Sequence, residues 1–128
     1  MTTASARTVN GKKTGLTMSK NKSKGTAFET LIVDYLKQFY PNCERRALQG
    51  ALDKGDITGV DNRLIFECKS HNTLNFSGWL KEAEVERVNA NAEVGVVVAK
   101  RRGYGKAEDQ YVVLTVKDLV RLLRITEY

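Results

Sequence analysis

Apolar residues recur at helical spacing in the first part of this chain that can form a core. The pattern predicts a helix that begins near Gly25 and ends before Pro41 and Asn42. The apolar face of this helix consists of Phe28, Leu31, Ile32, Tyr35, Leu36 and Phe39. Glu29 lies at the border of that face, where its carboxylate would lose part of its hydration. This acid is therefore a candidate for a functional role.

Five short segments predict strands in the rest of the chain. They are expected at residues 43–47, 56–60, 63–69, 94–99 and 111–116. A turn at Asp61 and Asn62 would join the second and third strands into an antiparallel hairpin. The segment from 94 to 99 contains no polar side chain, as expected for a strand that is covered on both faces.

Two further helices are predicted between and after these strands. One runs from about Gly78 to Asn91 with Ser77 as its N-cap. Its apolar side consists of Trp79, Leu80, Ala83 and Val88. Thr115 and Asp118 have the spacing of a capping box and would open a C-terminal helix. This order of helices and strands predicts a single α/β domain, with a mixed β-sheet flanked by helices.

The composition is that of one globular domain. The chain has 128 residues, of which 41% are hydrophobic and 28% are charged. No apolar stretch approaches the ~20 residues that cross a bilayer, and we expect no membrane partner. Two cysteines are too few for a disulfide framework and indicate a reducing cytoplasm. The single histidine argues against HNH, zinc-finger and His-triad chemistries.

The net charge of +6 is concentrated in residues 1–24. This segment contains no acid, and its basic residues account for the whole excess: Arg7, Lys12, Lys13, Lys20, Lys22 and Lys24. Its low apolar content predicts a flexible basic N-terminal arm, so that residues 25–128 form a charge-balanced domain. The arm is either a solvated leader or a segment that contacts phosphates, in which case salt would weaken nucleic-acid binding steeply.

Two opposite charges interrupt the apolar strand predicted at 63–69. Because side chains alternate along a strand, Glu67 and Lys69 would share one face, while Cys68 would be a buried thiol on the other. Hairpin pairing would bring Asp56 level with Glu67. Two carboxylates and the backbone carbonyl of Cys68 offer the oxygen ligands that Mg²⁺ or Mn²⁺ prefers, and Glu29 could reach the same site.

Lys69 would act beside an ion bound there. Its ammonium could orient or help deprotonate a water and stabilise the negative charge that develops on phosphorus. The plainer alternative is that Glu67 and Lys69 are alternating charges that keep a strand soluble, since Glu-x-Lys occurs by chance in a chain of this composition. The apolar strand, Asp56 at hairpin distance and Glu29 on the preceding helix favour the metal site.

These motifs resemble those of the PD-(D/E)xK nuclease superfamily, in which an acid on the first helix precedes an Asp and then Glu-x-Lys on a strand. Similarity to archaeal-type Holliday junction resolvases and their phage relatives lies in Lys24-Gly25-Thr26-Ala27-Phe28-Glu29, Asp56 and Glu67-Cys68-Lys69-Ser70. The resemblance covers about residues 24–124 in element order. It implies a restriction-endonuclease-like core with a metal-dependent nuclease domain over residues 25–128. Its catalytic residues would be Glu29, Asp56, Glu67 and Lys69. The resemblance also implies the cytoplasm of a bacterial, archaeal or phage-infected host cell.

The chain departs from the family motif at the position before the Asp. Gly55 precedes Asp56 where the family pattern has a proline. Because of this departure, Asp53 and Asp61 remain weaker rivals to Asp56 as the metal-binding acid of this part of the chain.

Basic residues are candidates for contacts with the DNA backbone. In chain order they are Lys24, Arg45, Arg46, Lys100, Arg101, Arg102 and Lys106. The last four belong to a glycine-containing loop after the buried strand, whose alternative role is that of a solvated loop. His71 is expected to be solvated, and Trp79 is expected to belong to the core or to a subunit interface.

The predicted function is that of a structure-selective DNA endonuclease, closest to a Holliday junction resolvase that acts on four-way junctions in recombination or repair. Two symmetric cuts resolve a junction and one small chain offers one site, so a twofold homodimer follows from this function. Two alternatives stay open. One is another nuclease of the superfamily, such as a nicking or restriction-type endonuclease or an exonuclease, and the other is a non-catalytic nucleic-acid-binding protein.

Overall fold

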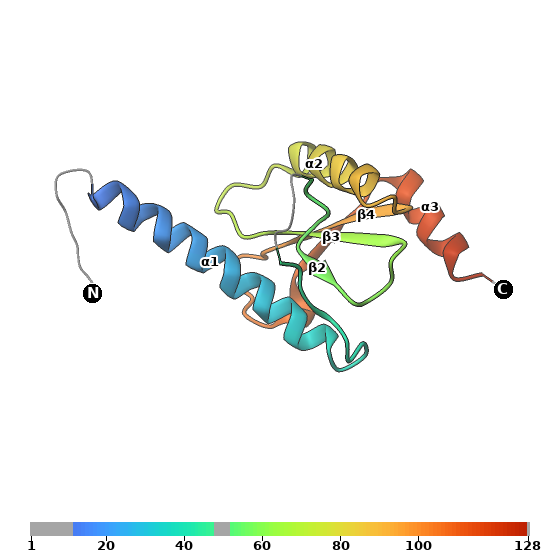
Figure 1. Cartoon of the computed structure of the whole chain (residues 1–128), viewed down its shortest axis with the longest axis horizontal. Coiled ribbons are helices and arrows are strands. Elements are labelled where there is room, and N and C mark those ends of the chain that lie inside the picture. The colour runs from blue at the N-terminus through green and yellow to red at the C-terminus, as the bar shows by residue number, and fades with distance from the viewer. Residues whose placement is uncertain (1–11, 48–51, 128) are drawn as a thin grey trace.

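A five-stranded mixed sheet forms the centre of the molecule, with helices on both of its faces (Figure 1). The computed structural model describes the backbone of residues 12–47 and 52–127, and the side chains of residues 23–47 and 52–127. The elements are α1 (Lys12–Leu36), β1 (Glu44–Arg45), β2 (Ile57–Thr58), β3 (Leu64–Lys69), α2 (Phe76–Asn89), β4 (Val94–Ala99), η1 (Ala107–Asp109), β5 (Tyr111–Val113) and α3 (Val116–Ile125). The predicted α/β fold is confirmed.

The strands follow one another across the sheet in chain order, β1-β2-β3-β4-β5. Strands β2 and β3 form the predicted antiparallel hairpin, in which Ile57 is opposite Phe66. Strands β3 and β4 are parallel, with Glu67 opposite Val97, and α2 makes the crossover between them. The edge strand expected near residue 44 and the last strand are also present, both shorter than predicted.

Two apolar clusters bury the two faces of the sheet. On the face covered by α1 and α3, the buried residues are Phe28, Ile32, Val33, Cys43, Ile57, Val94, Val96 and Val98. On the face covered by α2 they are Ile65, Trp79, Ala83, Ala92, Val97 and Ala99. Every residue of β4 is buried, as predicted from its unbroken apolar sequence. Trp79 is a core residue, 4% exposed.

Helix α1 is longer than the sequence pattern indicates. It begins at Lys12 rather than near Gly25, so that residues 12–24 of the predicted arm are helical, and its first half extends beyond the sheet (Figure 1). Extending an existing helix by a turn requires less free energy than nucleating a new helix. The half of α1 that packs on the sheet can therefore stabilise the helical conformation of the basic half. Residues 1–11 lie outside the described part, and phosphate binding by the arm stays a prediction. Phe39, expected in the core, is 59% exposed because the helix ends at Leu36.

The other two helices begin with side-chain caps. Asn75, not the predicted Ser77, caps α2, and its side chain accepts a hydrogen bond from the Gly78 N–H at 3.1 Å. Thr115 caps α3 as predicted and accepts from the Asp118 N–H at 3.1 Å. Of the helices that the structure describes, none is both long and apolar enough to cross a bilayer.

Candidate functional site

Strand β3 presents different chemistry on its two faces. Leu64, Phe66 and Cys68 pack against the apolar cluster under α1 and α3, while Ile65 belongs to the cluster under α2. Alternation therefore directs Glu67 and Lys69 to the α2 face, and Glu67 is only 6% exposed there. The prediction that these two charges share one face of a partly buried strand is confirmed.

Asp56 joins this site through the hairpin. Extending the antiparallel register by one residue beyond Ile57 and Phe66 places Asp56 opposite Glu67. The Asp56 N–H donates to the Phe66 carbonyl at 2.7 Å, and the Asp56 Oδ2 accepts from the Cys68 N–H at 2.8 Å. The backbone of β3 thus fixes the carboxylate of Asp56 beside the Glu67–Lys69 pair.

Gly55 has a backbone conformation that suits glycine and excludes proline. Its φ is +98°, and a Cβ at this position would lie 3.0 Å from the Phe66 carbonyl oxygen. Proline, whose ring fixes φ near about −65°, cannot adopt this conformation. Glycine therefore allows the chain to turn into β2 with Asp56 against β3.

The two rivals of Asp56 have other partners. The carboxylate of Asp61 accepts hydrogen bonds from the Arg63 side chain at 3.0 and 2.7 Å, which lower the pKa of Asp61. Asp53 accepts from the Gly55 N–H at 3.0 Å and lies at the margin of the acidic site, where its charge raises the pKa of Glu86. Of the three aspartates, Asp56 is the one fixed directly against β3.

Helix α2 adds two acids that the sequence analysis missed. Glu86 is 3% exposed and lies close enough to Glu67 for the two carboxyls to share a hydrogen bond. Glu82, one turn earlier, accepts a hydrogen bond from the Lys69 Nζ at 2.7 Å. The signal was the helical spacing of Trp79, Ala83 and Glu86, which are the buried residues of α2. Val88, assigned to the apolar side instead, is 62% exposed.

Burial perturbs the three central carboxyls strongly. It raises the pKa of Asp56 to about 8, that of Glu67 to about 7 and that of Glu86 to about 8. The charges of neighbouring carboxylates contribute further in the same direction. When all are ionised, the Oε1 atoms of Glu67 and Glu86 are buried without a hydrogen-bond partner among the described residues. The cluster therefore favours binding of a proton or of another cation.

Lys69 is held between two acids. Its Nζ lies 3.3 Å from the Glu67 Oε2 and 2.7 Å from the Glu82 Oε1, and its side chain is 14% exposed. Burial lowers the pKa of Lys69, but the contacts with Glu82 and Glu67 outweigh it and raise the pKa above its ordinary value. Lys69 is therefore a fixed cation at neutral pH, which favours charge stabilisation over removal of a proton from water.

Glu29 lies on the other side of the site. Its carboxylate accepts a hydrogen bond from the Arg45 Nε at 2.9 Å, so its nearest partner is a cation rather than another acid. Glu29 and Asp56 line one cavity of about 810 Å³, and the charge of Glu29 contributes to the raised pKa of Asp56. Its role as a further metal ligand stays a prediction.

The Cys68 thiol is on the opposite face from the acids, as predicted. Burial raises its pKa well above the ordinary value, and the charges of Asp56, Glu29 and Glu67 act in the same direction. A thiol that stays protonated is a poor nucleophile. The contribution of this residue to the site is its backbone.

Three of the predicted basic residues gather at the end of β3. Lys24, Lys100 and Arg102 line a cavity of about 410 Å³ together with Ser70 and His71, which follow Lys69 in the chain. His71 is exposed, and its ring centre lies 5.5 Å from that of Trp79 with the two rings tilted by 36°. Two residues of this basic cavity, Ser70 and His71, therefore directly follow the Glu67–Lys69 pair in the chain.

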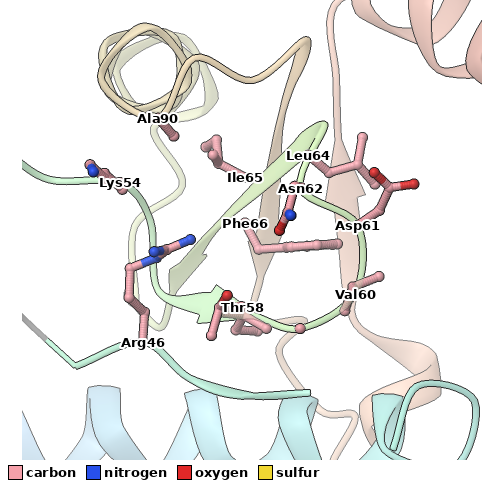
Figure 2. Close-up of a pocket in the computed structure, with 12 residues that line it drawn as sticks. Arg46, Lys54, Thr58, Val60, Asp61, Asn62, Leu64, Ile65, Phe66 and Ala90 are labelled. Carbon is pink, nitrogen blue, oxygen red and sulfur yellow. The ribbon is translucent and has the colours of Figure 1, made fainter. Parts of the chain in front are cut away.

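The other basic candidates have different surroundings. The guanidinium of Arg101 lies 3.6 Å from the ring centre of Tyr104, Arg45 binds Glu29, and Lys106 is exposed. Arg46 and Lys54 approach a third pocket, of about 310 Å³, from one side, with Asp61 on the other (Figure 2). The Arg46 Nε is buried there without a hydrogen-bond partner among the described residues.

The donor set of the acidic site fits a hard divalent cation. Asp56, Glu67 and Glu86 offer carboxylate oxygens, of which two are buried and unpartnered. In residues 23–47 and 52–127, no three His, Cys, Asp or Glu side chains are already arranged around a position that could hold an ion. The residues therefore fit such an ion in their chemistry, and binding would require side chains to turn toward it.

Comparisons of the whole chain with protein-family models, with curated proteins and with solved structures found no match. The resemblance to PD-(D/E)xK nucleases therefore depends on the motif residues and on their arrangement in space.

Proposed function

We propose that this protein is a metal-dependent DNA endonuclease of the PD-(D/E)xK type that cuts four-way junctions. The observation that carries the proposal is the placement of Asp56 beside Glu67 and Lys69 on one face of the sheet. These residues are separated in sequence by a turn, yet hairpin register brings two acids and one cation together. Glu-x-Lys alone is frequent by chance, whereas this three-residue arrangement is specific.

The oxygen ligands for Mg²⁺ or Mn²⁺ would come from the Asp56 and Glu67 side chains and from the Cys68 carbonyl. Such an ion, when bound, lowers the pKa of a water and neutralises charge on the phosphate. The raised pKa values of the two carboxyls support this assignment, since burial disfavours their ionised forms and a bound cation would offset that cost. Burial of ionised carboxylates is tolerated when they coordinate a metal.

Lys69 would act on the phosphate rather than on the water. In phosphodiester hydrolysis a water oxygen forms a bond to phosphorus, the ester bond to the leaving oxygen breaks, and negative charge increases on the phosphoryl oxygens. A protonated Lys69 next to Glu67 can stabilise that charge. Glu82 holds the ammonium in place from α2.

DNA would approach along the basic side of the site. Lys24, Lys100 and Arg102 line a cavity together with residues 70 and 71, which follow Lys69 in the chain. A DNA strand with one phosphate bound in this cavity could place another phosphate at Lys69. Contacts of this kind position the DNA without reading its sequence. This agrees with an enzyme that recognises branch shape.

A homodimer is part of the proposal, since resolution of a junction needs two sites. Candidate interface residues are apolar side chains that the single chain leaves exposed: Val85 and Val88 of α2, Val112 of β5, and Val116, Leu119, Val120 and Leu123 of α3. The first three lie on α2 and β5, and the residues of α3 extend this apolar surface. Light scattering coupled to size-exclusion chromatography measures the oligomeric state directly.

A cleavage assay tests the proposed function. A four-way junction and a linear duplex that contains the same sequences are incubated with the protein and Mg²⁺. We expect paired cuts in the junction and little cutting of the duplex. Equal cutting of both substrates would instead support another nuclease of the superfamily. Binding of DNA without metal-dependent cleavage would support the non-catalytic alternative.

A further inference from the structure

Glu86 is a buried acid without a cationic partner in the described part of the chain. It is 3% exposed, and no Lys or Arg of residues 23–47 and 52–127 forms an ion pair with it. The charged groups that face it are acids: Glu67 from β3, and Asp53 and Asp56 from the segment that leads into β2. A glutamine of the same shape would avoid the cost of burying this charge. Stability alone therefore does not account for Glu86.

Helix α2 places its acids in register with β3. Glu82 and Glu86 are one turn apart on the helix that covers the polar face of β3. Glu82 contacts Lys69, and Glu86 contacts Glu67. Each charged residue of the strand thus has an acid of α2 opposite it, but only Lys69 meets a partner of opposite sign there.

One oxygen of Glu67 and one oxygen of Glu86 have no partner among the described residues. The Oε1 atom of Glu67 and the Oε1 atom of Glu86 are buried and accept no hydrogen bond from any described residue. Glu67 is 6% exposed and Glu86 is 3% exposed, so water has little access to either carboxylate. Lys69 lies against the other oxygen of Glu67, at 3.3 Å from its Oε2, so a second positive charge would stabilise the two unpartnered oxygens, and hard oxygen donors suit a divalent cation.

We propose that Glu86 supplies a carboxylate oxygen to the divalent cation that Asp56 and Glu67 bind. The inference rests on the metal site of the proposed function and extends that site to α2. The carboxyls contact one another in pairs, so an ion that binds here takes the place of a shared proton. The ligands then come from three parts of the chain: the entry to β2, strand β3 and helix α2.

Binding of Mn²⁺ alone to the full chain, without DNA, tests this assignment. The variants are Glu86→Gln, which removes the charge and keeps the shape, and Glu84→Gln, which makes the same change at an exposed position of α2. Isothermal titration calorimetry should show Mn²⁺ affinity reduced about 10-fold or more in Glu86→Gln. The affinity of Glu84→Gln should equal that of the unaltered chain.

Thermal unfolding without metal separates a ligand from a structural residue. If Glu86 is a metal ligand and not a structural partner, Glu86→Gln without metal should unfold near pH 8 at the same temperature as the unaltered chain or at a higher one. A much lower unfolding temperature would show that the carboxyl is a structural partner and would overturn the assignment. The same conclusion follows if the unaltered chain binds no Mn²⁺, or if Glu86→Gln binds it as tightly.

The two proposals can fail independently. A chain that binds Mn²⁺ through Glu86 but cuts no DNA would reject the nuclease and keep the extended metal site. If the unaltered chain cuts junctions and Glu86→Gln binds Mn²⁺ with the same affinity, the nuclease proposal stands and the role of Glu86 is rejected.

Discussion

The two faces of strand β3 bury side chains of opposite character. Toward α1 and α3, Leu64, Phe66 and Cys68 join a continuous apolar cluster. Toward α2, Glu67 is as buried as many core residues, but its neighbours are the charged groups of Asp56, Glu86 and Lys69 instead of hydrocarbon. One face thus stabilises the fold, while the other holds charges that burial disfavours.

This difference teaches which buried residues serve stability and which serve function. Replacement of an apolar residue on the first face should cost stability, and neutralisation of an acid on the second face should cost activity while leaving the fold intact. Active sites often hold such unfavourable groups, and stability is sacrificed there. The predictions that follow probe this contrast, from the largest expected effect to the smallest.

A carboxylate introduced into the apolar face should have the largest effect. Val96 of β4 is 5% exposed and belongs to the cluster under α1 and α3. Val96→Glu would bury a charge without a partner, which should lower the free energy of unfolding by roughly 3–5 kcal/mol or prevent folding. Denaturation by urea, followed by circular dichroism, measures this loss.

Val112→Glu is the matched control for that substitution. Val112 lies on the neighbouring strand β5 and is 62% exposed in the single chain, so at concentrations that keep the chain monomeric the same change should alter the free energy of unfolding by less than about 0.5 kcal/mol. Equal losses in the two variants would contradict the distinction between a buried apolar face and an exposed position.

Gly55→Ala should have the next largest effect, because this glycine directs Asp56 toward the polar face. At φ +98°, with the Phe66 carbonyl oxygen 3.0 Å from the added Cβ, we expect a loss of about 2–3 kcal/mol. Gly103→Ala is the control, since it has φ +85° but open space around its Cβ, and should cost about 1 kcal/mol. Equal costs would show that the contact with β3 has no effect.

The pH dependence of stability reports the protonation of the buried carboxyls on the polar face. Folded-state pKa values raised to about 8 for Asp56 and Glu86 mean that the folded chain keeps protons which the unfolded chain releases near about pH 4. Their stabilising contribution is complete below that lower value and disappears as the pH passes the folded values. The free energy of unfolding should therefore fall between about pH 5 and pH 8.

Urea denaturation across this pH range measures the fall. Asp56→Asn should flatten it, whereas Glu84→Gln should not, since the pKa of Glu84 is lowered and its titration is complete below the range. Stability that rises from about pH 5 to pH 8 would refute the assignment of these raised pKa values.

The basic cavity at the end of β3 should show the smallest effect. Lys100→Ala or Arg102→Ala should weaken DNA binding modestly and reduce the slope of log affinity against log salt by about 1. Lys37→Ala, at an exposed position beyond the end of α1, should leave the slope unchanged. Fluorescence anisotropy at several salt concentrations gives these slopes, and identical slopes in all variants would exclude the cavity from the DNA path.

Much of this site could be predicted from local sequence. Alternation along a strand assigns Glu67 and Lys69 to one face, and hairpin register pairs Asp56 with Glu67, because both depend on neighbouring residues. Glu86 could not be assigned to the site in this way, since its role depends on how α2 packs across the sheet. The start of α1 at Lys12 was missed because cooperative extension of a helix leaves no apolar signal.

Cleavage by Glu67→Gln tests the central claim most directly. The substitution removes a buried charge from the polar face, so the chain should remain folded by circular dichroism and bind a four-way junction nearly as tightly as before. With Mg²⁺, the unaltered chain should cut the junction and Glu67→Gln should leave it intact. Undiminished cutting by the folded variant would contradict a metal site built on Glu67.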